Sequence, residues 1–393
     1  MLHFFRFYVN LQASIIPDFH KTRESVLRKK SIRKEVRRLR FIGRLIKRII
    51  GFAFLLLCIF ALLYLVPLTE KADSQGMAKD AEWMGALPDS VPLNEITLAG
   101  THASASQYTQ LPFLFRCQAM DVTAQLNAGF RYLDIGVAVE SVDGGGRLKL
   151  MNGFVDCLTG AMPDSDSLYL DAVLTQCYMF LQQHPTETVI IAVSQENGKD
   201  SVTSLQQLLY SYVRHDEQYW LLTERIPTLG ECRGKLVLMR SYEDAAGFGY
   251  AAGISLCWND QSAADNTTLH TAASNNGSYT LYVQDRSGYN DEEKWQAFLS
   301  GIATASGEIA NGAVSLNFLS SDGPLYFGHP YSHASVLNAA LRNRGDHLSG
   351  WIIVDFGEPY LARLVYESKT YPAVTGTTAT YGETEETAPI TLG

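Results

Sequence analysis

The sequence predicts an α/β fold, a (β/α)8 TIM-like barrel preceded by one transmembrane helix. Three observations lead to this prediction. An uncharged apolar run of 20 residues lies near the N-terminus, at Ile49–Leu68. About eight short apolar runs of strand character then follow one another along the rest of the chain. Most of them are followed by a stretch whose apolar residues recur at helical spacing, which is the order of elements in a parallel barrel.

The expected strands are rich in apolar and β-branched residues and are bounded by turn-forming residues. They are Glu95–Ala99, Arg131–Val139, Leu148–Asn152, Thr188–Val193, Gly234–Met239, Thr280–Val283, Ala313–Phe318 and Trp351–Phe356. The expected helices are Leu168–His184, Ser204–Val213, Asp291–Ala305, His333–Asn343 and Pro359–Ser368. Asn290 is a suitable N-cap for the third of these helices, whose first turn is acidic.

The apolar run Ile49–Leu68 is long enough to cross a hydrocarbon core of about 30 Å as a helix. It has no polar face, unlike most core helices of soluble proteins. A cleaved signal peptide fits less well, because 48 residues precede the run and no clear A-x-A site follows it. Lys and Arg are concentrated on its N-terminal side. The positive-inside rule therefore predicts a signal anchor with a cytoplasmic N-terminus and an extracytoplasmic barrel.

The charge is distributed unevenly along the chain. Residues 1–50 contain 14 Lys/Arg and 3 Asp/Glu, a net charge of +11, whereas the remainder contains 18 and 38, a net charge of −20. An acidic barrel argues against nucleic-acid binding, and no obligate protein partner is indicated. The basic segment Ser25–Arg48 either lies on the anionic inner leaflet or is a solvated flank that sets the topology.

These features divide the chain into five segments. We expect a basic cytoplasmic segment at 1–48, a transmembrane anchor at 49–68, a polar linker at 69–80 and a barrel at 81–369. Residues 370–393 form a Thr-rich tail without apolar periodicity, which is typical of disorder.

The six cysteines give little support for a disulfide framework or a metal site. Cys58 lies in the apolar run, which leaves an odd number for the barrel. One disulfide is compatible with this number, but the sequence does not indicate a pairing. No CxxC or His-Cys spacing typical of zinc is present, so we expect no metal.

Polar residues follow the expected strands at the end where barrel enzymes carry their catalytic groups. They are His102, Asn152, Glu196, Arg240, Asp285, Asn317 and Asp355. A polar residue at a strand end often only caps a turn. The presence of seven such residues at one rim favours a functional site there.

The segments that carry these residues resemble the bacterial phosphatidylinositol-specific phospholipase C family. The resemblance begins in WMGALPDSVPLNEITLAGTHAS (Trp83–Ser104), close to the family's GTHDS motif, and continues in LNAGFRYLDIGV (Leu126–Val137). Further similar segments are FLQQHPTETVIIAVSQE, LGECRGKLVLMRSY, YVQD, VSLNFLSS and GWIIVDF, in the family's order. The resemblance implies a distorted barrel. It also implies a histidine base that activates the inositol 2-hydroxyl, a histidine acid, and an arginine on the phosphate. The metal-independent branch of the family needs no cofactor, and we expect none here.

The resemblance assigns roles to only part of the catalytic set. His102 matches the base, and Asp355 matches the carboxylate that orients it. Ala103 replaces the aspartate of GTHDS, Gly136 replaces the phosphate-binding arginine, and Asn152 replaces the acid histidine. The loss of a general acid costs about 10²–10⁴ in rate, so the barrel is expected to be a poor phospholipase unless another group substitutes.

Other positions extend the predicted site. Asp134 is retained as a catalytic carboxylate. Asp285 matches an inositol-hydroxyl contact, and three further rim residues are candidates for headgroup binding, namely Glu196, Arg240 and Asn317. His329 and His333 are either surface loop histidines or substitutes for the missing acid.

Two apolar clusters lie where the family contacts membranes. They are LPFLF, with Phe113 and Phe115, and LYF, with Tyr326 and Phe327. Each cluster either belongs to the core or rests on a lipid surface.

Two functions therefore remain. The first is a membrane-anchored extracytoplasmic phosphodiesterase/lyase that cleaves a glycerophospholipid headgroup by His-based intramolecular attack on phosphorus. The second is a catalytically impaired barrel that binds inositol phospholipid headgroups. The expected partners in both cases are a phospholipid membrane and an inositol phospholipid or a related headgroup.

Overall fold

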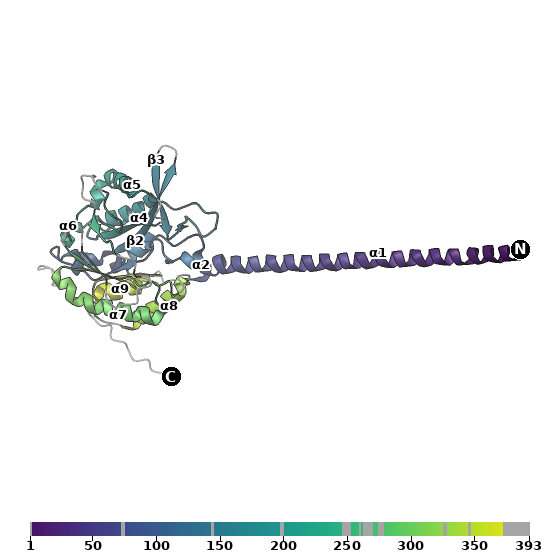
Figure 1. Cartoon of the computed structure of the whole chain (residues 1–393). Coiled ribbons are helices and arrows are strands. Elements are labelled where there is room, and N and C mark those ends of the chain that lie inside the picture. The colour runs from purple at the N-terminus through teal and green to yellow at the C-terminus, as the bar shows by residue number, and fades with distance from the viewer. Residues whose placement is uncertain are drawn as a thin grey trace, which may run out of the picture. The chain divides into compact units, whose positions relative to one another are not determined.

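The computed structural model describes residues 2–71, 75–142, 145–196, 200–245, 253–258, 261, 270–273, 279–324, 328–344 and 347–371. The chain divides into two compact units, Met1–Leu62 and Leu63–Gly393. Figure 1 shows the first unit as one long helix and the second as a sheet covered by helices.

The first unit consists of helix α1 (Leu2–Phe60), which includes both the basic segment and most of the predicted membrane span. The segment Arg28–Thr69 contains an 18-residue window with a mean hydropathy of 3.0, and none of that window is buried. Length and composition thus allow this segment to cross a membrane, and a signal sequence near an N-terminus meets the same criterion. Beyond α1 the chain forms a wider π-helical turn at Ala61–Leu65 and a tighter 3₁₀ turn at Pro67–Thr69.

The second unit is built on a curled sheet whose central strands are parallel. Along the sheet the parallel strands are β7 (Leu236–Arg240), β5 (Val189–Gln195), β2 (Tyr132–Val142), β1 (Leu98–Thr101), β12 (Trp351–Val354), β11 (Val314–Phe318) and β10 (Thr280–Gln284). Shorter strands extend its ends, namely β6 (Trp220–Leu221), β8 (Ile254–Ser255) and β9 (His270–Ala273). Among the described strands no ladder joins β10 to β7, so the barrel is distorted and incompletely closed.

All eight expected strands are present, and two differ from the prediction. Leu148–Asn152 lies in β3 (Gly145–Asn152), which pairs antiparallel with β2 and with β4 (Val155–Asp156), so it forms a hairpin and is not a parallel barrel strand. The first strand begins at Leu98 and not at Glu95. Tyr371 accepts a hydrogen bond from Thr97 N, and Lys369 donates one to Glu95 O, so side chains satisfy the backbone that was expected to pair.

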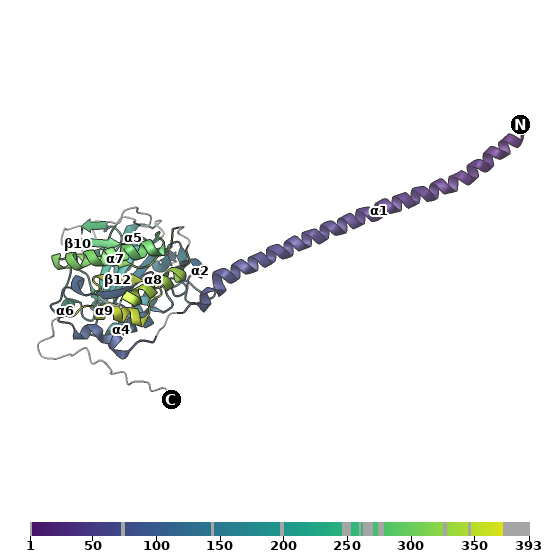
Figure 2. The same cartoon turned by 90° about the horizontal axis from the view of Figure 1, so that it is seen from below.

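Five long helices cover the sheet, close to the predicted positions. Helices α4 (Leu170–Gln183) and α5 (Val202–His215) lie on one side. Helices α7 (Asp291–Glu308), α8 (Pro330–Arg344) and α9 (Pro359–Glu367) lie on the other side, as Figures 1 and 2 show. Asn290 caps α7 as predicted, since its Oδ1 accepts from Glu293 N at 3.0 Å.

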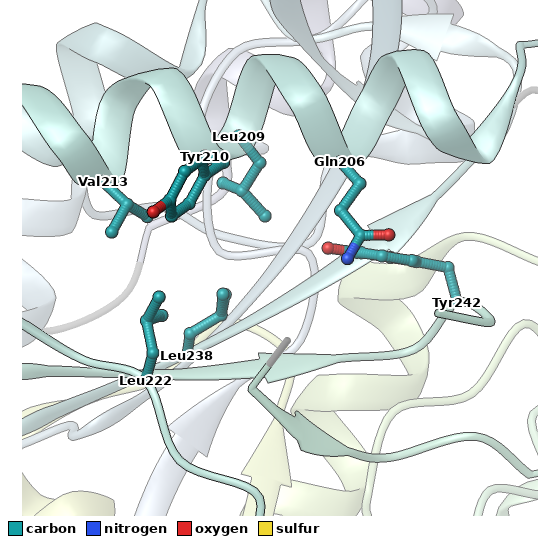
Figure 3. Close-up of a pocket in the computed structure, with 7 residues that line it drawn as sticks. All are labelled: Gln206, Leu209, Tyr210, Val213, Leu222, Leu238 and Tyr242. Carbon is teal, nitrogen blue, oxygen red and sulfur yellow. The ribbon is translucent and has the colours of Figure 1, made fainter. Parts of the chain in front are cut away.

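Strand alternation divides the core into an inner cluster and two outer clusters. Leu98, Tyr132 and Trp351 pack inside the curled sheet, whereas their neighbours Ala99 and Ile352 pack against the helices. A small apolar cavity of about 10 Å³ remains between α5 and the sheet and is shown in Figure 3. It has no charged lining residue and room for no more than one water molecule. It is therefore not a candidate site.

The two ends of the expected linker 69–80 pack against the barrel. Glu70 is buried beside His329, and Asp80 is buried in an ion pair with Arg363 at 2.6 Å. Residues that precede the first strand therefore already pack against the barrel.

Candidate active site

A pocket of about 240 Å³ opens at the carboxyl ends of the parallel strands. Its lining residues are His102, Leu114, Phe115, Cys117, Asn152, Gly153, Glu196, Asp322 and Gly328. His102 follows β1, Asn152 ends β3 and Glu196 follows β5. The fold thus brings three of the predicted site residues into one pocket, at the end of the barrel where the sequence placed them.

His102 and Asp355 form the best-defined pair in this pocket. His102 Nδ1 lies 2.8 Å from Asp355 Oδ1, although the two residues are 253 positions apart in the sequence. The carboxylate is only 3% exposed, while the imidazole is 27% exposed. This arrangement fixes the ring and leaves its Nε2 as the nitrogen not bound to the carboxylate, as a general base requires.

Two amide side chains hold this pair in place. Gln118 Nε2 donates to His102 O at 2.8 Å and to Val354 O at 3.0 Å, and thus joins the ends of β1 and β12. Asn338 Nδ2 donates to Asp355 O at 2.9 Å. Both amides are almost completely buried. The geometry of the pair is therefore determined by the core and not by a flexible loop.

The residues that follow His102 and Asp355 have unusual backbone conformations. Ala103 has φ 42° and Phe356 has φ 47°, in the left-handed region that non-glycine residues rarely adopt. Such strain persists only where surrounding contacts enforce it, and it is concentrated at functional sites.

The electrostatic environment keeps His102 in its charged form over a wider pH range than usual. Burial lowers its pKa, but Asp355 raises it by charge and by hydrogen bonding, and the net pKa is well above the ordinary value of 6.5. The carboxylate therefore makes the imidazole a stronger base.

Asn152 occupies the position of the expected acid, and its amide is already engaged. Its Nδ2 donates to Phe115 O at 2.7 Å and to Cys117 Sγ at 3.4 Å. An amide does not release a proton at ordinary pH, so Asn152 cannot replace a histidine acid.

Gly136 leaves a space that Glu196 fills. A Cβ at position 136 would lie 2.5 Å from Glu196 Cγ and 2.6 Å from Met151 O. The Glu196 carboxylate is held by Gly153 N at 3.1 Å and by Ser194 Oγ at 2.7 Å. A carboxylate thus stands where the resemblance would place an arginine.

Two further carboxyl groups in this region retain protons more readily than usual. Burial raises the pKa of Asp134 to about 6, with a smaller contribution from Glu196, while His102 opposes the shift. Asp134 Oδ2 accepts from Ala103 N at 3.3 Å. Burial also raises the pKa of Asp322, which lines the pocket.

Cys117 lies beside the His102–Asp355 pair. One ring nitrogen of His102, Cys117 Sγ and one Asp355 oxygen all lie within 4.8 Å of one another. The thiol is 2% exposed, and burial raises its pKa to about 12. The described cysteines are all free.

Three predicted binding residues are not among the residues that line the pocket. Asp285 accepts from Trp258 Nε1 at 3.2 Å, and Arg240 is buried with Nη1 donating to Tyr242 O at 2.7 Å. Asn317 faces α7, since its Nδ2 donates to Phe298 O at 2.9 Å. Because alternate residues of a strand face opposite sides, Asn317 lies on the helix side of β11, away from the inner cluster that contains Leu316 and Phe318.

Neither candidate substitute histidine lines the pocket. Both ring nitrogens of His329 are engaged, Nδ1 with Phe113 O at 2.8 Å and Nε2 with Glu70 Oε1 at 2.7 Å. His333 Nδ1 lies 2.6 Å from Asp291 Oδ1. These contacts fix the positions of the two histidines. Neither imidazole therefore supports the role of an acid in this pocket.

The predicted membrane-contact residues are partly described. Phe113 stacks on His329 with ring centroids 4.0 Å apart, and Phe115 contacts Phe154, whose side chain is 68% exposed. Tyr326 and Phe327 lie outside the described residues. An exposed aromatic side chain is therefore present beside the pocket, next to Phe115.

Comparisons with known proteins find two bacterial phosphodiesterases that are similar in sequence. A 1-phosphatidylinositol phosphodiesterase of Staphylococcus aureus is 29% identical over 304 residues, which cover 72% of this chain and 90% of that protein. A 1-phosphatidylinositol phosphodiesterase of Listeria monocytogenes is 30% identical over 206 residues, which cover 47% of this chain and 59% of that protein. The chain is therefore similar in sequence to bacterial 1-phosphatidylinositol phosphodiesterases, in agreement with the resemblance found in its motifs. No family model matches it.

Solved structures of phosphatidylinositol-specific phospholipases C have the same fold. One from Staphylococcus aureus aligns with a TM-score of 0.61 at 22% identity and covers 75% of this chain and all of its own. One from Listeria monocytogenes aligns with a TM-score of 0.54 at 21% identity, over 74% of this chain and 99% of its own. The predicted distorted TIM-like barrel is thus confirmed.

Sequence reasoning missed several residues that line the pocket or support it. Gln118 and Cys117 do not follow an expected strand, and Asp322 lies four residues beyond one, so a position directly after a strand did not identify them. For Gln118 the one available signal was its place in a short polar stretch between the apolar LPFLF cluster and the next helix.

Proposed function

We propose that the barrel cleaves phosphatidylinositol or a related inositol phospholipid as a phosphodiesterase, with His102 as the base. The observation that carries the proposal is the 2.8 Å contact between His102 Nδ1 and Asp355 Oδ1 in an open pocket. In this reaction the neutral form of His102 takes the proton from the inositol 2-hydroxyl. The freed oxygen attacks phosphorus, the bond to the diacylglycerol oxygen breaks, and a cyclic inositol phosphate forms.

A group other than Asn152 must then protonate the departing diacylglycerol oxygen. We assign this role to Asp134. Burial raises the pKa of its carboxyl to about 6, and its Oδ2 accepts a hydrogen bond from the backbone N of Ala103, the residue after His102. Among the described residues that line the pocket there is no arginine or lysine, and His102 is the one basic side chain there that can balance the phosphate charge. We therefore expect a slow enzyme.

The second candidate function, headgroup binding without turnover, is favoured by one observation. Glu196 fills the space beside Gly136. A carboxylate near the phosphate weakens stabilisation of the transition state, because negative charge builds up on the phosphoryl oxygens there.

A vesicle assay separates these two functions. The full-length chain in detergent is incubated with phosphatidylinositol vesicles, and the products are identified by phosphorus NMR. Cyclic inositol phosphate is expected, and it should disappear in His102→Ala. His215→Ala is the matched control, since His215 is 83% exposed at the end of α5. Phosphatidylcholine should remain intact, because its headgroup has no hydroxyl for intramolecular attack. Binding that is stronger to phosphatidylinositol vesicles than to phosphatidylcholine vesicles, without product, would favour the binding function, because α1 inserts into both.

We also propose that α1 anchors the barrel, with residues 1–48 cytoplasmic and the barrel extracytoplasmic. The apolar, unburied window within Arg28–Thr69 and the basic segment before Ile49 support this orientation. Protease added to intact cells should digest the barrel and spare an epitope at the N-terminus. Digestion of the barrel only after permeabilisation would contradict the orientation.

A further inference from the structure

The pocket contains three side chains that together form a ligand set for a soft divalent cation. His102, Cys117 and Asp355 come from three separate segments, and each offers one ligand atom within 4.8 Å of the other two. We propose that these three side chains bind one divalent cation of the zinc class. The spacing of the cysteines predicted no metal site. The fold nevertheless brings the three side chains together from distant positions in the sequence.

The types and geometry of these ligands suit zinc. Imidazole nitrogen, thiolate sulfur and carboxylate oxygen are its usual ligands, with bonds of about 2.0–2.3 Å in a tetrahedral arrangement. Ligand atoms in such a site lie about 3–4 Å apart, so shifts of about 1 Å would bring the three atoms together. Three protein ligands leave a fourth position open, and this position would face the pocket.

The surroundings of the three ligands also favour a cation. Cys117 and Asp355 are 2% and 3% exposed, so the site is shielded from bulk water. Asn152 Nδ2 donates to Cys117 Sγ at 3.4 Å, a contact that stabilises negative charge on the sulfur. The other ionisable residues in the described part of the lining are Glu196 and Asp322, and this part includes no lysine or arginine. Their negative potential attracts cations.

A different use of Cys117, as a nucleophile activated by His102, fits less well. Burial and the nearby Asp355 raise the pKa of the thiol to about 12, although His102 opposes this shift. Very little thiolate is then present without a cation. A bound cation displaces the thiol proton to solvent and holds the sulfur as thiolate.

Binding of the cation would compete with the proposed base. A cation on His102 takes up a nitrogen lone pair, and Asp355 is diverted from its partner. This consequence for turnover depends on the proposed function, whereas the binding site itself does not. Added zinc is therefore expected to inhibit any phosphodiesterase activity of the wild-type chain.

Direct metal binding tests the proposal independently of activity. The full-length chain is stripped with a chelator and titrated with Co²⁺, followed by displacement with Zn²⁺ in competition with a chromophoric chelator. We expect a single equivalent, with sulfur-to-cobalt charge-transfer absorption in the near ultraviolet. Cys117→Ser should abolish this absorption and weaken zinc binding by at least about 100-fold.

Cys177→Ser is the matched control, because Cys177 is a buried free cysteine on α4. It should keep both the absorption and the affinity. Asp355→Asn, a second variant, should weaken binding while the thiolate absorption remains at saturating cobalt. Absence of thiolate absorption in the wild-type chain, or equal zinc affinity in wild type and in a folded Cys117→Ser, would overturn the proposal. Zinc binding without any phosphodiesterase activity would contradict only the proposed function.

Discussion

The two edges of the pocket differ in how they are built. The base edge, formed by the ends of β1 and β12, keeps His102 on Asp355 and supports both with the buried amides of Gln118 and Asn338. The other edge, here called the acid edge, is formed by the middle of β2 and the ends of β3 and β5. Gly136 leaves room there for Glu196, which accepts from Gly153 N, and Asn152 donates to Phe115 O. The difference shows that the acid edge is closely packed and that its polar side chains are hydrogen-bonded.

At the acid edge, several side chains depend on one another for their packing. A single lost catalytic residue would leave a gap that one substitution could refill. Here Glu196 fills the space beside Gly136, and the Asn152 amide binds Phe115 O and Cys117 Sγ. Restoring a cation and an acid would therefore require several linked changes.

The largest effect is expected at the base edge. Asp355→Asn keeps the size of the side chain but removes the charge that raises the pKa of His102, so the activity should fall by about 10²-fold or more. The initial rate of inositol phosphate release measures this effect. An unchanged rate in a variant with normal thermal stability would show that the pair is structural only.

A substitution at the acid edge is expected to lower the stability of the fold. In Gly136→Arg the new Cβ would meet Glu196 Cγ at 2.5 Å and Met151 O at 2.6 Å. Overpacking of this kind costs about 1–3 kcal/mol, so the melting temperature should fall. Thermal unfolding of Gly136→Arg beside Gly136→Arg/Glu196→Ala tests the cause. The double variant should recover part of the loss, and an unaffected Gly136→Arg would contradict the packed acid edge.

The pair of His329 and Glu70 gives a smaller, pH-dependent effect at the pocket rim. Burial lowers the pKa of His329, but Glu70 raises it, and the net pKa is above 6.5. The protonated histidine is therefore favoured by folding. The stabilisation is complete below pH 6.5 and is lost as the pH rises through the raised pKa.

Glu70→Gln tests this pair. The variant should lose about 1–3 kcal/mol at low pH, where a charged hydrogen-bonded partner has been removed, and less at high pH. Chemical denaturation of the wild type and the variant, at pH values below and above the pKa of His329, gives the difference in their free energies of unfolding. A constant difference at all pH values would mean that Glu70 does not stabilise the protonated form of His329.

Much of the fold could be predicted from the sequence because apolar periodicity determines it locally. The eight strands and five long helices were placed to within a few residues, since each has its own apolar pattern. Short elements such as α3 (Val122–Asn127) and β4 lacked a periodicity long enough to recognise. The reversed direction of β3 was missed because the two-strand hairpin and a parallel strand have similar apolar patterns.

The site was predicted only in part, because the sequence shows which residues end a strand but not which way their side chains face. His102 and Asp355 follow strands that the sequence shows, and the parallel topology brings such ends together. Asn317 also lies at a strand end, but alternation along β11 turns it toward α7. Cys117 reaches the pocket through an irregular segment, so its position depends on long-range packing that no local pattern reports.

The most direct test of the account is a side-by-side measurement of phosphatidylinositol cleavage by His102→Ala and Asn152→Ala in the full-length chain. The account assigns chemistry to the base edge and packing to Asn152. It predicts a fall of at least about 100-fold for His102→Ala and of less than about 10-fold for Asn152→Ala. Equal losses in the two variants, or an unaffected His102→Ala, would contradict it.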